Sequence, residues 1–179
     1  MHQDLDRILL TEEQLKEKVQ ELGAQISRDY EGKNLLLVGL LKGSVVFMSD
    51  LMRAITVDAG IDFMSVSSYG KAAKTSGVVK IIKDLQEEIA DYDVLIVEDI
   101  LDSGMTLSYI TQLLQARGPK SIRLCTLLDK PERHKVDVHI DYLGFTIPDE
   151  FIVGYGLDFA ERYRNLPYIG VLSPKVYET

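Results

Sequence analysis

The chain has 179 residues, of which 46% are hydrophobic and 27% are charged. This is about the length of one domain and the composition of a folded one, so a disordered or collagen-like chain is excluded. Acidic residues outnumber basic residues by 28 to 20, and the net charge of −8 opposes non-specific binding to nucleic acid. A bound anion would therefore need local amides, a few placed cations or a bridging metal.

Cysteine, histidine and hydrophobic runs exclude further classes of protein. Cys125 is the only cysteine, which excludes an intrachain disulfide, a CxxC pair and a thiolate zinc cage. The three histidines are too scattered for a histidine metal site. The longest apolar run, residues 35–41, is far below the ~20 residues that span a bilayer. Residues 1–7 lack the hydrophobic core of a secretory signal, so we expect a cytoplasmic protein with no membrane or nucleic-acid partner.

Hydrophobic periodicity predicts alternating helices and strands over the first 128 residues. Thr11-Glu12-Glu13-Gln14 has the form of a capping box, and apolar residues at helical spacing follow it. In chain order the predicted elements are a helix over 12–29, a strand over 35–40, a helix over 45–55, strands over 61–69 and 78–82, a strand over 94–97, a helix from Leu107 that closes at Gly118-Pro119, and a strand over 122–128. This order predicts an α/β fold with a mainly parallel twisted sheet flanked by helices.

The pattern changes past Lys130, where prolines and glycines divide the chain into short pieces. We interpret this part as short strands and loops over the sheet, not as another crossover. In open α/β sheets, ligands bind beyond the carboxyl ends of the strands. We therefore expect the functional residues at that rim.

The segment VLIVEDILDSGMTL, residues 94–107, carries the most chemistry. A hydrophobic strand ends in the acid pair Glu98-Asp99, and a loop with glycine and hydroxyl residues then opens a helix. Loop amides, the helix dipole and the hydroxyls of Ser103 and Thr106 can hold a phosphate. Acids beside a phosphate loop repel the ligand unless sugar hydroxyls or Mg²⁺ satisfy them, which indicates a sugar phosphate with Mg²⁺. The alternative is solvated strand-end acids and a simple helix N-cap.

This segment resembles the phosphoribosyl-pyrophosphate signature of the type I phosphoribosyltransferases. Flanking segments narrow the resemblance to the hypoxanthine-guanine phosphoribosyltransferases and cover most of the chain in family order. They are LLLVGLLKGSVVF (35–47), SSYG (67–70), LLDKPERH (127–134) and PDEFIVGYGLDFAERYRNL (148–166). The resemblance implies a single domain over 1–179 with the type I phosphoribosyltransferase fold. A small hood would be formed by the N-terminal region and about 130–179.

The resemblance also implies a purine salvage transferase that depends on Mg²⁺. It would move the 5-phosphoribosyl group from phosphoribosyl pyrophosphate to a 6-oxopurine, hypoxanthine or guanine. The products would be IMP or GMP plus pyrophosphate. Because the family forms dimers and tetramers, we expect a homodimer or homotetramer.

The family's site residues carry over onto matching positions of this chain. Asp102 would be the general base at N7 of the purine. The phosphoribosyl group and its 5′-phosphate would bind Glu98, Asp99, Asp102, Ser103, Gly104, Met105 and Thr106; the pyrophosphate would bind Lys42, Gly43 and Arg164; the purine would bind Lys130, Phe151, Ile152 and Asp158; and the metal would bind Glu98, Asp99 and Asp158. Lys130 would donate to O6 of the base, Phe151 would stack on it, and the carbonyl of Ile152 would contact its edge.

Ser68 and Tyr69 match the family's mobile lid loop, and the peptide before Lys42 can be cis in that family. The chain departs from the pattern at Met105, where members vary, and at Phe159, where many members carry tyrosine. Each predicted site residue, taken alone, also has an interpretation without a functional role. Lys130 would be a surface lysine, Phe151 a core residue, and the charges at 158 and 164 solvated.

Three other interpretations stay open from the sequence. The first is a phosphoribosyltransferase for another base, such as xanthine. The second is a non-catalytic regulator that keeps the phosphoribosyl-binding fold and binds RNA, although the net charge and Asp102 argue against it. The third is a phospho-receiver domain, which the phosphate loop after Asp99 and the long C-terminal segment oppose. The sequence does not decide the preference among hypoxanthine, guanine and xanthine.

Overall fold

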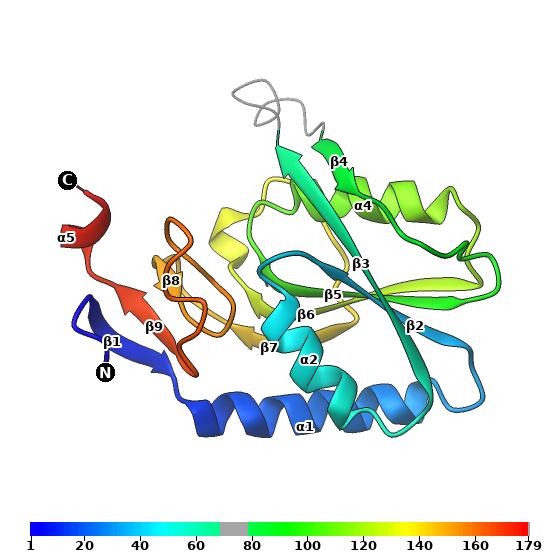
Figure 1. The fold of residues 1–179 in the computed structure, drawn as a ribbon, viewed down its shortest axis with the longest axis horizontal. Helices are drawn as coiled ribbons and strands as arrows, with labels where there is room; N and C mark the ends of the chain where they lie inside the picture. Colours follow the sequence, from blue (N-terminus) through cyan, green and yellow to red (C-terminus); the bar gives the residue numbers. More distant parts are fainter. Residues whose placement is uncertain (69–78, 179) are drawn as a thin grey trace.

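The computed structural model describes residues 1–68 and 79–178 (Figure 1). Within these residues the main layer is a six-stranded sheet in the order β4-β3-β2-β5-β6-β7, parallel except for β3 with β4. Its strands are β2 (Leu35–Leu40), β3 (Ala59–Ser68), β4 (Val79–Lys83), β5 (Asp93–Leu101), β6 (Ser121–Asp129) and β7 (Tyr142–Thr146). The predicted α/β fold with a mainly parallel sheet is confirmed.

Helices cover both faces of this sheet. Helices α1 (Glu12–Asp29) and α2 (Val45–Ala54) pack on one face, and α4 (Met105–Gln115) packs on the other (Figure 1). Residues of β2 alternate between the two cores: Leu37 joins the cluster under α1 and α2, and Val38 joins the cluster under α4. A strand buried on both faces has no polar positions, which is why this strand is a continuous apolar run in the sequence.

A second, antiparallel sheet has the order β1-β9-β8. It consists of β1 (Leu5–Leu10), β8 (Ile152–Val153) and β9 (Ile169–Leu172), followed by the short helix α5 (Pro174–Tyr177). The two ends of the chain therefore lie together beside the main sheet (Figure 1). We had not predicted β1, because its partner β9 lies at the far end of the sequence and no local pattern marks the pairing.

Two expectations were wrong in detail. Strand β7 lies past Lys130 but joins the main sheet, pairing parallel with β6. Its connection contains the 3₁₀ turn Pro131–Arg133 and lacks the helical periodicity of a crossover. The acid pair lies inside β5, not after its end, because Ile100 and Leu101 still pair with β6. In the described part of the chain, no helix is long and apolar enough to cross a membrane.

Candidate active site

The predicted site residues gather at the carboxyl ends of β2, β5 and β6. A Cβ added to Gly43, in the loop after β2, would stand 2.1 Å from Oδ2 of Asp99. A Cβ on Gly156, in the loop after β8, would stand 2.4 Å from the carbonyl oxygen of Gly43. The loop after β2, the end of β5 and the loop after β8 are therefore in direct contact, and only glycine fits at both contacts.

The acid pair lies near the end of β5. The Asp99 N–H donates to Oε1 of Glu98 (2.9 Å), and the Ile100 N–H donates to Oδ1 of Asp99 (2.7 Å). Burial, followed by the negative charge of Asp99, raises the pKa of Glu98 well above its ordinary value. Burial also raises the pKa of Asp99. Adjacent buried carboxylates with raised pKa values favour a group that supplies positive charge or hydroxyl donors.

The donor chemistry of this pair fits a hard divalent cation, because carboxylate oxygens are the ligands that Mg²⁺ prefers. The described residues contain no group of three or more His, Cys, Asp or Glu side chains that could hold a metal ion. Glu98, Asp99 and Asp158 therefore do not form a ready three-carboxylate cage. Mg²⁺ usually keeps waters and substrate oxygens in its shell, so an incomplete protein shell suits it.

The loop after β5 leads straight into α4. Gly104 has φ of 83° immediately before the helix, a left-handed conformation that disfavours other residues. The hydroxyl oxygen of Ser103 accepts from the Met105 N–H (3.2 Å), and the Ser103 carbonyl accepts from the Lys135 N–H (2.9 Å). Amides in the first turn of a helix have no intrahelical acceptor. The loop 102–106 therefore offers the N–H groups and positive helix end that an anion needs.

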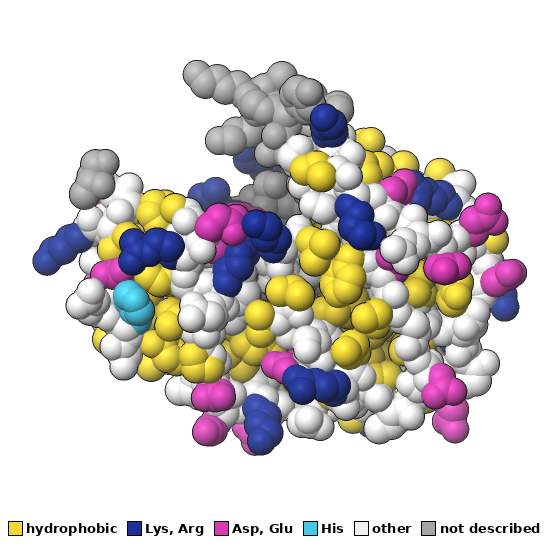
Figure 2. All heavy atoms as spheres, viewed as in Figure 1, with side chains coloured by type: hydrophobic (Ala, Val, Ile, Leu, Met, Phe, Trp, Pro, Cys, Tyr) yellow, Lys and Arg dark blue, Asp and Glu magenta, His cyan; other side chains and the backbone are white. Residues whose placement is uncertain are grey.

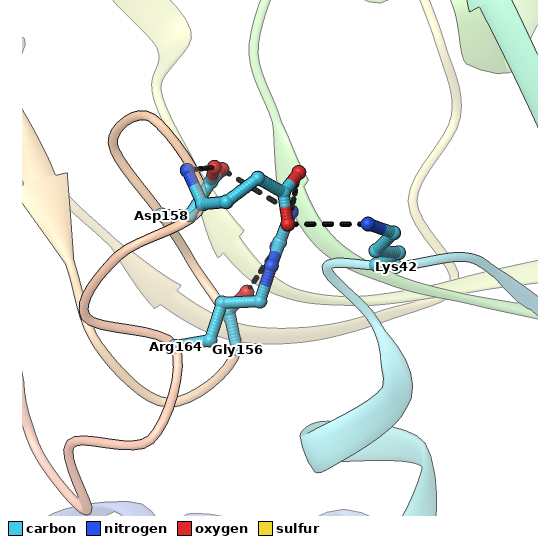
Figure 3. A network of polar contacts seen from close by, with 5 residues as sticks. Lys42, Gly156, Asp158 and Arg164 are labelled. Carbon is cyan, nitrogen blue, oxygen red and sulfur yellow. Dashed lines mark hydrogen bonds and ion pairs between the residues drawn. The ribbon is translucent and has the colours of Figure 1, made fainter.

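Lys42 and Arg164 meet at one carboxylate, that of Glu161 (Figure 3). Lys42 Nζ lies 3.2 Å from Oε2, and Arg164 Nη2 lies 3.3 Å from Oε1. Asp158 accepts from the Glu161 N–H (2.8 Å), and its Oδ1 lies 3.5 Å from Arg164 Nη2. Lys42 and then Arg164 lower the pKa of Glu161. Basic and acidic side chains also gather over this loop in the space-filling view (Figure 2).

Arg164 is held on its other side as well. Its Nη1 donates to the Gly156 carbonyl (2.6 Å), while its buried Nε has no hydrogen-bond partner within the described residues. The peptide between Leu41 and Lys42 is cis. Because two cations converge on one anionic group, this corner has the charge arrangement of a small anion site.

A pocket of about 410 Å³ contains four of the predicted residues, Asp102, Lys130, Phe151 and Ile152. Ile100 and Leu157 line it too. Lys130 is only 8% exposed, which sets it apart from an ordinary surface lysine, and its amine has no hydrogen bond to any described residue. Phe151 is 37% exposed and so is not a core residue. Asp158 does not line this pocket.

The structure adds residues to the pocket that we had not predicted. Tyr177 of α5 stacks on Phe151, with ring centroids 4.6 Å apart and planes at 22°. Arg133 donates from Nε to Oδ1 of Asp102 (3.0 Å), and Asp149 and Glu150 line the pocket beside it. Arg133 lies in the motif LLDKPERH, which places this residue near the site but does not indicate that it pairs with Asp102. Nothing local in the sequence connects Tyr177 with the pocket.

The two predicted lid residues, Ser68 and Tyr69, lie where the described part of the chain ends. Ser68 is the last residue of β3. Tyr69 lies outside the described residues.

Comparison with known proteins identifies the family. A family model described as the phosphoribosyl transferase domain matches residues 8–160. The hypoxanthine-guanine phosphoribosyltransferase of Staphylococcus aureus (strain MW2) is 56% identical over 177 residues, which are 99% of each chain. The chain belongs to the hypoxanthine-guanine phosphoribosyltransferase family. Bifunctional protein TilS/HprT of Listeria innocua is 54% identical over 99% of this chain, which spans 27% of that relative's length.

Solved structures of the hypoxanthine-guanine phosphoribosyltransferase family have the same fold. A crystal structure of a hypoxanthine phosphoribosyltransferase from Staphylococcus aureus superposes with a TM-score of 0.97 at 56% identity, covering 100% of this chain and 97% of that one. The hypoxanthine phosphoribosyl transferase of Trypanosoma cruzi superposes with a TM-score of 0.96 at 38% identity, covering 99% and 96%. The resemblance inferred from the motifs is confirmed.

Gly43→Ala tests the contact between the loop after β2 and the acid pair. The new Cβ would overlap Oδ2 of Asp99, so the loop or the carboxylate must move. A misplacement of ~1 Å in an active site can cost about 10²-fold in rate, and we expect a loss of that order in phosphoribosyl transfer. The measurement is kcat/KM beside the melting temperature. Gly60→Ala is the control, because its Cβ would meet the end of the Leu36 side chain at 3.3 Å and the Leu35 carbonyl oxygen only at 4.0 Å. Unchanged kcat/KM in Gly43→Ala would contradict the packing argument.

Proposed function

We propose that the chain is a Mg²⁺-dependent purine salvage transferase. It moves the 5-phosphoribosyl group from phosphoribosyl pyrophosphate to hypoxanthine or guanine and releases pyrophosphate. The observation that carries this proposal is that the loop 102–106, the acid pair, the two-cation corner and the 410 Å³ pocket adjoin at one rim. The names of the relatives, which are hypoxanthine or hypoxanthine-guanine phosphoribosyltransferases, support the same reaction.

Each part of the rim takes one part of the substrates in this proposal. Amides and hydroxyls of Ser103, Gly104, Met105 and Thr106 bind the 5′-phosphate. Glu98 and Asp99 bind the ribose hydroxyls. Lys42, Gly43 and Arg164 bind the pyrophosphate, and Glu98, Asp99 and Asp158 would hold the metal. When bound, Mg²⁺ supplies positive charge that stabilises the pyrophosphate as it leaves.

The purine lies in the pocket, stacked on Phe151 and with its edge against Ile152. Asp158, which does not line the pocket, would contact the purine from the loop after β8. Lys130 donates to O6, which favours a 6-oxopurine, because adenine would present an amino group to the same donor. The bond from C1′ to the pyrophosphate oxygen breaks, the bond from C1′ to N9 forms, and Asp102 accepts the proton from N7. Lys42 and Arg164 oppose the charge that grows on the leaving group. We assign Ser68 and Tyr69 to a lid that excludes water.

We further propose a cytoplasmic homodimer or homotetramer built from one domain. Val45 and Met52 of α2 are 41% and 37% exposed, and Ile61 of β3 is 45% exposed. Hydrophobic side chains gather over this region (Figure 2). An apolar face of this kind supports association with a second copy.

Asp102→Asn tests the general base. The amide cannot take up the N7 proton, so we expect a fold like that of the wild type and a kcat lower by roughly 10²–10⁴-fold. IMP formation from hypoxanthine at saturating phosphoribosyl pyrophosphate is the measurement. Asp84→Asn is the control, because Asp84 pairs with Arg117 and lies outside the pocket. Turnover near the wild-type rate would remove Asp102 from this role.

Removal of the metal tests the cofactor. EDTA should abolish IMP formation, and added MgCl₂ should restore it, because Glu98 and Asp99 need a cation to face a polyanionic substrate. Circular dichroism should be the same with and without EDTA, since the fold holds no metal cage in its described part. Persistent activity in EDTA would contradict the assignment.

Glu161→Gln tests the pyrophosphate corner. The carboxylate occupies both cations, so its neutralisation should free Lys42 and Arg164 for substrate. Exposed ion pairs are weak, so the gain in substrate binding is modest and KM for phosphoribosyl pyrophosphate should fall by roughly two- to fivefold. KM for hypoxanthine should not change. A higher KM for phosphoribosyl pyrophosphate would show that Glu161 helps substrate binding.

A further inference from the structure

Arg133 makes a direct bond to the carboxylate that we assign as the general base. Its Nε donates to Oδ1 of Asp102 at 3.0 Å. Within the described residues, this is the only side-chain hydrogen bond that Asp102 makes, and the Asp102 side chain is 47% exposed. Without Arg133, the carboxylate would rotate in solvent and Oδ2 would have no fixed direction.

The backbone around Arg133 is fixed to the loop that carries Asp102. The Lys130 N–H donates to the Leu101 carbonyl (3.0 Å), and the Lys135 N–H donates to the Ser103 carbonyl (2.9 Å). Lys130 and Lys135 lie on either side of the 3₁₀ turn in the chain, and their partners Leu101 and Ser103 lie on either side of Asp102. The turn is held a second time by the contact between His134 Nε2 and Asp129 Oδ1 at 2.5 Å. The guanidinium therefore approaches Asp102 from an anchored support.

The far end of the guanidinium has a second acidic neighbour. Arg133 Nη1 lies 3.9 Å from Oδ2 of Asp149, which also lines the pocket. The side chain thus extends between two carboxylates of the pocket wall. In this position Arg133 forms a hydrogen bond with Oδ1 of Asp102 and leaves Oδ2 without a hydrogen bond from Arg133.

We propose that Arg133 is a positioning residue: it holds Oδ1 of Asp102 so that Oδ2 faces N7 of the bound purine. A general base that is oriented by a third group is a common arrangement, because proton transfer requires a fixed geometry. This inference rests on the proposed function, since it uses the role given there to Asp102. It adds a residue whose effect on the reaction passes through Asp102 alone.

A double-mutant cycle on the full chain tests this coupling. The variants are Arg133→Gln, Asp102→Asn and the two combined, with IMP formation measured over a range of hypoxanthine concentrations. Arg133→Gln should lower kcat about tenfold, a part of the 10²–10⁴-fold that general acid–base catalysis contributes, and should change KM for hypoxanthine little. In the Asp102→Asn background, Arg133→Gln should have no further effect.

Two further variants complete the design. Arg133→Lys keeps the charge, and a partial recovery of kcat relative to Arg133→Gln is expected because the amine reaches Oδ1 without the fixed fork. Arg117→Gln is the matched control, because this arginine pairs with an aspartate, Asp84, outside the pocket. It should leave kcat and KM unchanged.

Two results would overturn the proposal. An equal loss of kcat in both backgrounds would show that Arg133 does not act through Asp102. A raised KM for hypoxanthine at unchanged kcat would make Arg133 a direct contact of the base. Absence of IMP formation by the wild-type chain would refute the proposed function itself, which separates the two failures.

Discussion

Two adjacent carboxylates at the end of a buried strand set the electrostatic condition for everything around them. Ionisation of both Glu98 and Asp99 in that position is unfavourable, because burial raises the pKa of each. A cation or a set of hydroxyl donors relieves this condition. In the proposed function, an activated pentose with Mg²⁺ would supply both, and a chain with a net charge of −8 could then bind a polyanion.

In the proposed function, the rest of the rim would divide the charges of such a ligand among separate groups. Backbone amides and a helix end would bind the phosphate, and Lys42 and Arg164 would bind the leaving group. These two cations share the carboxylate of Glu161. Arg133 likewise holds Asp102. Internal ion pairs thus hold the charged groups of the rim in place.

Much of the fold and part of the site could be predicted from the sequence. The helix over 12–29 and the strand over 35–40 have the predicted bounds, because a capping box and a continuous apolar run are local signals. The family motifs identify four residues that line one pocket, Asp102, Lys130, Phe151 and Ile152, so this part of the site could be predicted. Strand β1, Tyr177 and the partners of Glu161 and Arg133 depend on contacts between distant segments, which leave no local pattern.

The positions of the acid pair and of β7 show the same limit. Pairing with β6 extends β5 through Leu101, and the residues of β5 alone do not indicate that register. β7 is a short segment, YLGFT, that contains Gly144 and is soon followed by Pro148, and such a segment is equally typical of a loop. Tertiary pairing, not local propensity, decided both.

The binding of phosphoribosyl pyrophosphate with and without Mg²⁺ is the most direct test of the central claim. Isothermal titration should show an affinity at least tenfold lower in EDTA for the wild-type chain. The double variant Glu98→Gln, Asp99→Asn should lose most of that dependence on Mg²⁺, because its neutral side chains no longer need a bridging cation. Equal affinity of the wild-type chain in both conditions would contradict the claim that divalent cations join this ligand to the acid pair.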